Sequence, residues 1–152
     1  MLASAVALTI ALIAQYGFRL EPCELCSYQR IPYVSVLLFG GGALAIGEWN
    51  KRAVGYLFST IFLTGATLAF YHVGVEQLWW QATTSCGGHQ PLPNSLDELH
   101  LSLSQGMVKA CNEIDWTLLG LSMTVYNMAA SLLLAAACFL LSKRPNKVSD
   151  EK

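Results

Sequence analysis

Residues 53–71 read AVGYLFSTIFLTGATLAFY, an uninterrupted run without a charged side chain. An α-helix needs about 20 consecutive apolar residues to cross the hydrocarbon core of a bilayer, with a range of roughly 17 to 25. Three more uncharged runs of suitable length lie elsewhere in the chain, at residues 2–18, 31–47 and 117–141. The sequence therefore predicts an all-α integral membrane protein, a bundle of four transmembrane helices.

Composition supports this class. The chain has 152 residues, which suits a single membrane domain over 1–152, and only 12% of them are charged. That is about half the share found in soluble domains. The net charge of −1 gives no reason to expect nucleic acid as a partner. No basic segment of the kind typical of cleaved signal peptides precedes the first run, so we expect an uncleaved helix.

Lysine and arginine are distributed unequally between the two ends of the predicted bundle. Six of them lie in the link at 48–52 and in the tail after residue 142, and three lie in the other two connections. Because basic residues are enriched in cytoplasmic segments, we expect both termini in the cytoplasm. The loops at 19–30 and 72–116 are then predicted to face the outside.

Five cysteines is a high number for so small a membrane protein, and four fall in the predicted outer loops: Cys23, Cys26, Cys86 and Cys111. Disulfides persist outside the cytoplasm, so these four can form two pairs. Cys138 lies alone within the fourth predicted span. There we expect an inert thiol that packs as a small apolar residue.

Cys23 and Cys26 are separated by two residues, directly before the second predicted helix. Such a pair closes a small, readily reduced ring suited to thiol–disulfide exchange. A helix N-terminus favours a thiolate, and Arg30 follows Cys26 by about one helical turn. We therefore expect Cys26 to have a lowered pKa and to be the more reactive sulfur. Arg30 alone would be a common interfacial anchor.

A zinc site is the alternative use of such a pair. Zinc would need two further ligands, and the candidates are Cys86, Cys111, His72, His89 and His100. The second cysteine pair is widely spaced, however, and does not repeat the two-residue gap typical of zinc-binding motifs. Redox chemistry without a metal is therefore the favoured interpretation.

The stretch from Pro22 to Arg30, PCELCSYQR, stands between two predicted spans, and here the sequence resembles a known family. It is similar to the DsbB family of quinone-coupled, disulfide-generating membrane proteins. The similarity covers nearly the whole chain and includes a stretch from Cys111 to Asn127. It implies a protein-disulfide oxidoreductase of the bacterial inner membrane with periplasmic redox loops. Its expected cofactor is ubiquinone or menaquinone.

The resemblance also implies roles for the four outer cysteines. Cys23 and Cys26 would be the pair beside the quinone, with Cys26 facing its ring and Cys23 exchanging with the second loop. Cys86 and Cys111 would form the pair that reoxidises a soluble thioredoxin-like, DsbA-type partner. Cys86 would form the mixed disulfide with that partner.

Three residues are expected at the quinone. Arg30 matches a family arginine that supports quinone binding, and Gln15 matches a glutamine near the quinone. Gln15 could equally hydrogen-bond a neighbouring helix. His72 precedes Glu76 by four residues, which predicts a surface hydrogen-bonded pair beyond the third span, although a titratable imidazole would also suit proton uptake by a quinone. Gln29 departs from the best-known member and leaves the subfamily open.

The second outer loop carries a further pattern. Apolar residues recur at helical spacing over 92–107, and Asn94 or Ser95 can cap the start. Few basic residues accompany them, which predicts a short helix half-buried in the membrane interface. Glycine and proline over 87–93 predict a mobile stretch beside Cys86.

Two other functions fit parts of the sequence. A non-catalytic four-span protein could use external disulfides only to brace its loops, but a ring closed over two residues braces little. A vitamin K epoxide reductase-like quinone reductase also has four helices, yet there the CxxC is expected late in the chain. The thiol oxidase is therefore the favoured hypothesis.

Overall fold

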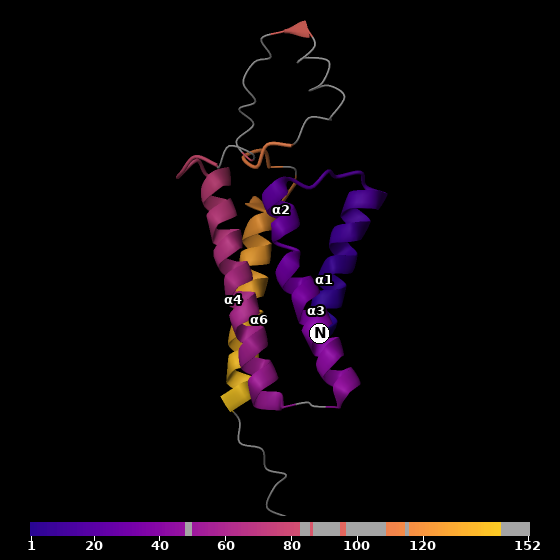
Figure 1. Ribbon diagram of the computed structural model, residues 1–152. Helices are drawn as coiled ribbons and strands as arrows, with labels where there is room; N and C mark the ends of the chain where they lie inside the picture. The colour runs from indigo at the N-terminus through magenta and orange to yellow at the C-terminus, as the bar shows by residue number, and fades with distance from the viewer. Residues whose placement is uncertain (48–49, 83–85, 87–94, 97–108, 115, 144–152) are drawn as a thin grey trace, which may run out of the picture.

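The computed structural model describes residues 1–47, 50–82, 86, 95–96, 109–114 and 116–143. Nearly all of the regular structure among them is helical (Figure 1). The elements in chain order are α1 (Leu2–Leu12), the π-helical turn η1 (Ile13–Gly17), α2 (Glu24–Tyr28), α3 (Ile31–Ile46), α4 (Lys51–Glu76), β1 (Thr117–Leu118), β2 (Leu121–Ser122) and α6 (Met123–Lys143).

Three helical segments are long and apolar enough to cross a membrane: Glu24–Ile46, Arg52–Glu76 and Met123–Lys143. The apolar helix Leu2–Gly17 is shorter. At most 28% of each spanning window is buried inside the protein, so most of these side chains face outward, as expected where lipid replaces water. These helices confirm the predicted class, a mostly helical membrane protein, with three long apolar helices and one shorter one among the described residues. The helix expected over 92–107 lies almost entirely outside the described residues.

Local signals in the sequence explain where two of these helices begin and end. Pro32 occupies the first turn of α3, where its missing N–H has no helical partner to lose. Gly47 ends α3 in the left-handed region, with φ of 74°. Asn50 then caps α4, because its side-chain oxygen accepts hydrogen bonds from the backbone N–H groups of Arg52 and Ala53 at 3.1 and 3.3 Å.

The third predicted span ends at residue 71, but α4 continues to Glu76. The prediction that His72 and Glu76 stand beyond the span is therefore wrong, since both lie on the last turns of the helix. Gly74 interrupts the apolar pattern there without breaking the helix. The space that a Cβ at Gly74 would need is occupied by the indole of Trp80.

The fourth predicted span begins at residue 117, but α6 begins only at Met123. The six residues before it form a hairpin in which Thr117 pairs with Ser122 and Leu118 with Leu121. Its two turn residues, Leu119 and Gly120, have φ of 50° and 79°. A two-residue hairpin turn of type I′ has positive φ at both positions, and Gly120 adopts such a φ without strain. Hydropathy alone does not detect this turn.

The helices associate in two pairs. α4 and α6 lie side by side along most of their length, and α1 lies against α3 (Figure 1). A cluster of buried side chains joins α3 to the α4–α6 pair, composed of Tyr33, Val36, Phe58, Phe62 and Ala135. Gly65 allows α4 to approach α3 closely, because a Cβ there would come within 3.1 Å of Pro32.

The chain after α4 folds back onto the end of that helix. The Trp80 ring stacks on Tyr71 with centroids 5.8 Å apart and an interplanar angle of 13°. Its indole N–H donates to the backbone carbonyl of Tyr71 at 3.0 Å. Trp80 also packs against the buried cluster that contains Cys86. This return of the chain brings the second cysteine pair to the end of the bundle where α2 begins.

Candidate active site: two cysteine pairs at a buried histidine

Cys23 is the N-cap of α2, and Cys26 lies one turn into that helix. Their sulfurs are 2.7 Å apart, so the pair is a hydrogen-bonded dithiol. The backbone N–H of Cys26 also donates to the Cys23 sulfur, at 3.2 Å. Cys23 is only 4% exposed, whereas Cys26 is partly exposed. The CxxC spacing thus places one sulfur at a helix N-terminus and the other beside it.

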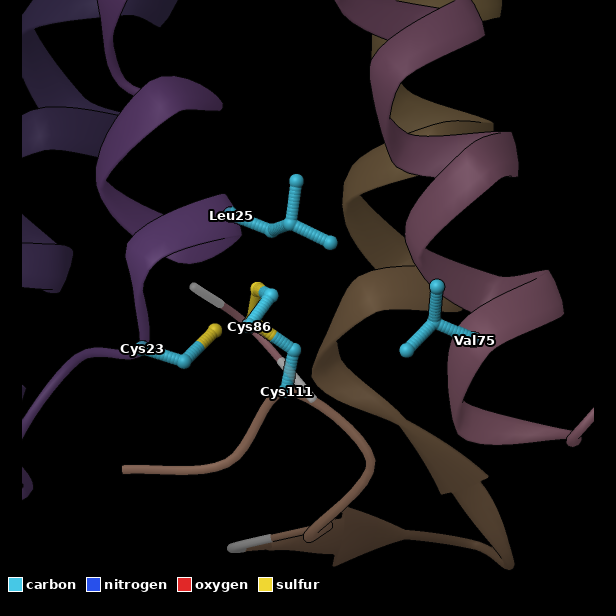
Figure 2. Close-up of a cluster of buried hydrophobic side chains, with 5 residues drawn as sticks. All are labelled: Cys23, Leu25, Val75, Cys86 and Cys111. Atoms are coloured by element: carbon cyan, nitrogen blue, oxygen red, sulfur yellow. A yellow bond between two sulfur atoms is a disulfide. The ribbon is translucent and has the colours of Figure 1, made fainter. Parts of the chain in front are cut away.

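Cys86 and Cys111 are joined by a disulfide, the pairing that the family resemblance implies. The backbone N–H of Cys111 donates to the carbonyl of Cys86 at 2.9 Å. Both residues belong to one buried cluster with Cys23, Leu25 and Val75. Figure 2 shows the side chain of Cys23 directed toward this disulfide. The two cysteine pairs are therefore packed together at the same end of the bundle.

His72 connects the two pairs. It is 2% exposed, and its Nε2 atom lies 3.6 Å from the Cys23 sulfur and 3.2 Å from the backbone carbonyl oxygen of Cys111. Its Nδ1 atom lies 2.8 Å from the side-chain nitrogen of Gln29 and 3.4 Å from the hydroxyl of Thr124. The His72 imidazole thus contacts the inner pair, Cys23 and Cys26, through the Cys23 sulfur. It contacts the outer pair, Cys86 and Cys111, through the Cys111 carbonyl.

A chain of hydrogen bonds runs from His72 into the bundle. The Tyr33 hydroxyl lies 3.1 Å from that of Ser131 and donates to the Asn127 side-chain oxygen at 2.6 Å. The Asn127 amide donates to the Gln29 oxygen at 2.6 Å, and the Gln29 nitrogen faces His72 Nδ1. Read in this direction, Nδ1 accepts, so the proton is on Nε2, facing the Cys23 sulfur.

Glu76 closes the other side of the histidine. Its carboxylate accepts hydrogen bonds from the hydroxyls of Ser122 and Thr124, each at 2.5 Å, and lies 3.9 Å from His72 Nε2. The Glu76 side chain is 5% exposed. The prediction of a surface pair between His72 and Glu76 is therefore wrong. The hairpin before α6 explains the difference, because it brings Ser122 over the end of α4.

The structure assigns the thiolate to Cys23. The hydrogen bond that Cys23 shares with Cys26 lowers its pKa to about 4, and hydrogen bonds with His72 and the Cys26 backbone act in the same direction, against the effect of burial. The sequence predicts the lowered pKa at Cys26. That prediction fails because the N-cap position belongs to Cys23, and because His72 comes from a distant part of the chain.

A cavity opens beside this dithiol. Its volume is about 170 Å³, more than ten times what one water molecule needs. Cys26, Arg30 and His72 line it, together with apolar side chains from α1 and from the start of α6. An Arg30 guanidinium nitrogen donates to the side-chain oxygen of Gln15 at 2.5 Å. The structure thus gathers every predicted site residue around the dithiol and this cavity.

Several polar residues of the site escape the sequence analysis. They are Tyr33, Ser122, Thr124, Asn127 and Ser131, and Gln29 is noticed only as a departure from a family pattern. An asparagine inside an apolar run is a signal that could have found one of them, since polar groups in spans generally have a partner. Cys138 packs against the cluster between α3, α4 and α6, apart from the other cysteines. His89 and His100 lie outside the described residues.

A helical membrane protein with a buried dithiol packed against a disulfide belongs to the class of membrane thiol–disulfide oxidoreductases. The family model described as disulfide bond formation protein DsbB matches residues 1–141. The chain belongs to this family, and is a disulfide bond formation protein of the bacterial inner membrane with several spans.

Similar proteins support the assignment. The chain is 31% identical to disulfide bond formation protein B of Acinetobacter baylyi, over 100% of this chain and 93% of that protein. It is 31% identical to the protein of the same name from Acinetobacter baumannii, over 91% and 84%. An uncharacterized protein of Rickettsia prowazekii is 32% identical, over 86% and 77%. No solved structure matches the chain.

Proposed function

We propose that this protein is a quinone-dependent thiol oxidase that reoxidises a soluble thioredoxin-like, DsbA-type partner through its two cysteine pairs. Four helices would span the membrane, with both termini in the cytoplasm and the redox loops in the periplasm. The observation that carries the proposal is the position of His72 Nε2, within 3.6 Å of the Cys23 sulfur and 3.2 Å of the Cys111 carbonyl. Electron transfer between two cysteine pairs requires that their sulfurs come together, and Cys23, Cys86 and Cys111 belong to one buried cluster.

The exchange begins at the outer pair. A thiolate of the partner attacks the Cys86 sulfur and breaks the bond to Cys111, which leaves as a thiolate. Cys111 then attacks Cys23 in the oxidised inner pair, and Cys26 leaves as a thiolate. When the partner's second thiol displaces Cys86, and Cys86 displaces Cys23 from Cys111, the outer disulfide is restored. Two electrons have then reached the inner pair.

His72 and the N-terminus of α2 stabilise the Cys23 thiolate, the sulfur that is attacked and later released. The Nε2–H group and the Cys26 N–H both point to negative charge on Cys23, and this charge develops whenever Cys23 leaves Cys111. Glu76 stabilises an imidazolium through its carboxylate at 3.9 Å. His72 can therefore hold a proton released as the dithiol is oxidised.

The cavity beside Cys26 fits a quinone head group. It combines apolar walls with the guanidinium of Arg30 and the amide of Gln15, the kind of donors that hold a carbonyl oxygen. Ubiquinone or menaquinone, when bound there, would supply a two-electron acceptor. Arg30 would orient it, and His72, which also lines the cavity, would hold a proton beside Cys23. The surrounding apolar side chains would keep water from the sulfurs.

The decisive experiment combines purified protein, a reduced DsbA-type partner and a quinone, with quinone absorbance as the readout. Ser variants of Cys23, Cys26, Cys86 and Cys111 should each lose turnover, because each breaks one exchange step. Cys138→Ser is the matched control and should retain it, since Cys138 lies in a different cluster. Full turnover in Cys26→Ser would refute the mechanism.

Topology has a separate test. A membrane-impermeant maleimide added from the periplasmic side should label reduced Cys23 or Cys26 in intact spheroplasts. Labelling of this pair only from the cytoplasmic side would contradict the proposed orientation.

A further inference from the structure

We propose that the reduced Cys23–Cys26 pair and His72 form a binding site for one thiophilic metal ion of the zinc type. The two sulfurs and His72 Nε2 all lie within 4.8 Å of one another. They come from the N-cap of α2, the first turn of α2 and the end of α4. The inference rests on the proposed function only in requiring that the pair be reducible, since a disulfide offers no thiolate ligand.

The spacing of these atoms is close to what zinc requires. Bond lengths of about 2.3 Å to sulfur and 2.0–2.1 Å to nitrogen in a tetrahedral site place ligand atoms about 3.6 Å (S to N) and 3.8 Å (S to S) apart. The Cys23 sulfur and His72 Nε2 are already 3.6 Å apart. The two sulfurs, at 2.7 Å, must separate by about 1 Å. Cys26 has room for this movement because it borders the cavity.

The donor set selects the kind of ion. Two thiolates and an imidazole favour zinc, cadmium or copper(I) over the oxygen-seeking magnesium and calcium. The other two cysteines of this cluster are bonded to each other and do not compete. Glu76 also lines the cavity beside these ligands, and the cavity is large enough for a water molecule to complete the coordination.

The hydrogen-bond chain behind His72 can serve a metal site as well as a thiolate. A histidine that ligates through Nε2 carries its proton on Nδ1 and donates it to an acceptor. Gln29 becomes that acceptor when its amide turns over, and Asn127 turns with it. Tyr33 then accepts from Asn127 and donates to Ser131. Every group in this chain stays paired in both directions, and it is the Cys111 carbonyl oxygen that loses the Nε2–H donor when the tautomer changes.

Binding is an acid–base event and moves no electrons. The metal binds the Cys23 thiolate directly and replaces the thiol proton of Cys26, which is released to solvent. The pair cannot close its disulfide while both sulfurs ligate the ion. A bound metal would therefore hold the protein in its dithiol state until the ion leaves.

The test uses Co²⁺ alone, titrated into the reduced full-length protein in detergent without quinone or partner. We expect one equivalent to bind, with a thiolate-to-cobalt charge-transfer band and the intense visible bands of a tetrahedral site. Zn²⁺ should displace it and protect Cys23 and Cys26 from alkylation. The oxidised protein should give no signal. Absence of the charge-transfer band in the reduced protein would overturn the proposal.

Two variants assign the third ligand. His72→Gln should weaken Co²⁺ binding at least about tenfold and change the visible bands, because a nitrogen ligand is lost. An unchanged affinity and spectrum would mean that the cysteines bind alone, which overturns the site. Gln29→Glu should instead tighten binding, since a carboxylate accepting from Nδ1 makes the imidazole a stronger ligand. This gain does not arise from damage to the fold, and its absence would also count against the site.

Cys138→Ser is the control and should bind Co²⁺ like the parent protein. The outcome is separable from the proposed function. Metal binding without quinone-dependent turnover would support the metal site and contradict the proposed oxidase function. Turnover without metal binding would do the reverse.

Discussion

The inner pair, Cys23 and Cys26, and the outer pair, Cys86 and Cys111, differ in what holds them. The inner cysteines are two residues apart, and helix α2 itself positions them. The outer cysteines are 25 residues apart in the sequence, and packing holds them in one buried cluster with Leu25 and Val75. Local backbone geometry therefore sets the first pair, and tertiary contacts set the second.

Burial sharpens this difference. Cys86 is 2% exposed and Cys111 is 0% exposed, whereas Cys26 of the inner pair is partly exposed toward the cavity. The pair assigned to the soluble partner is thus the more enclosed of the two. Exchange with a partner then requires that Cys86 leave its cluster, so the packing around it should control the rate of reduction.

The largest effect should come from removing the sulfur that faces the cavity. Cys26→Ser should lower quinone-dependent turnover by roughly three orders of magnitude, because the inner pair can no longer close its disulfide. In this variant the Cys23 thiolate can still attack Cys111 of the Cys86–Cys111 disulfide and release Cys86 as a thiolate, and peptide mass mapping under non-reducing conditions will detect the resulting Cys23–Cys111 bond. Cys138→Ser should show neither change. If the Cys23–Cys111 bond does not form, the two pairs do not exchange as proposed.

Removing the histidine should have the next largest effect. His72→Leu takes away a hydrogen bond that lowers the pKa of Cys23 from its ordinary value toward about 4. The thiolate exists above that pKa, so a raised pKa should move the alkylation profile of Cys23 to higher pH. Alkylation at pH 6 should fall, and turnover should drop by about a hundredfold. The measurement is the rate of iodoacetamide labelling of the reduced protein between pH 3 and 9.

His72→Gln is the matched control for that profile, because its amide can still donate to the sulfur. It should shift the alkylation curve less than His72→Leu. Equal shifts would mean that the hydrogen bond does not set the pKa.

A smaller effect is expected from breaking the chain behind the histidine. Asn127→Leu leaves the Gln29 oxygen without its donor and removes the Asn127 acceptor from the Tyr33 hydroxyl, which keeps its contact with Ser131. The free energy of unfolding should fall by about 1–3 kcal/mol. Turnover should fall several-fold, because His72 loses its fixed tautomer. Ser131→Ala, at the far end of the chain, should change both quantities less, and the reverse order would contradict the arrangement.

The smallest effect should appear at the outer pair. Trp80→Ala removes the ring that stacks on Tyr71 and packs against the cluster of Cys86. Reduction of the Cys86–Cys111 disulfide by a small dithiol should then become several times faster, with little change in the alkylation profile of Cys23. Acid quenching at set times followed by mass spectrometry measures the rate of disulfide reduction and the rate of Cys23 alkylation. If only the alkylation profile of Cys23 changed, Trp80 would support the inner pair, which would contradict the proposal that it packs around the outer pair.

The sequence predicts much of the fold because hydropathy and helix caps act locally. The uncharged runs predict the positions of the long helices, and the structure adds Gly47 at the end of α3 and Asn50 as the cap of α4. Two boundaries escape. Residues 117–122 are as apolar as a span but form a hairpin, and α4 extends past residue 71. Backbone dihedral angles decide the first case, and the fold-back of Trp80 against Gly74 decides the second.

The candidate site divides in the same way. The CxxC spacing and the count of outer cysteines are properties of the sequence itself, and they indicate disulfide chemistry before any helix is placed. The position of His72 cannot be read from them, because 49 residues separate it from Cys23. Nor can the Glu76 contacts, since these depend on the hairpin over the end of α4.

By itself, the amino-acid sequence determined the membrane setting, the helices and the presence of two unlike cysteine pairs. Hydrophobicity and residue spacing act over a few turns, and they leave a readable pattern. Only the tertiary structure brought together the groups that lower the pKa of Cys23. A pKa depends on donors within a few ångströms, and the donors to Cys23 come from two helices that meet only in the folded bundle.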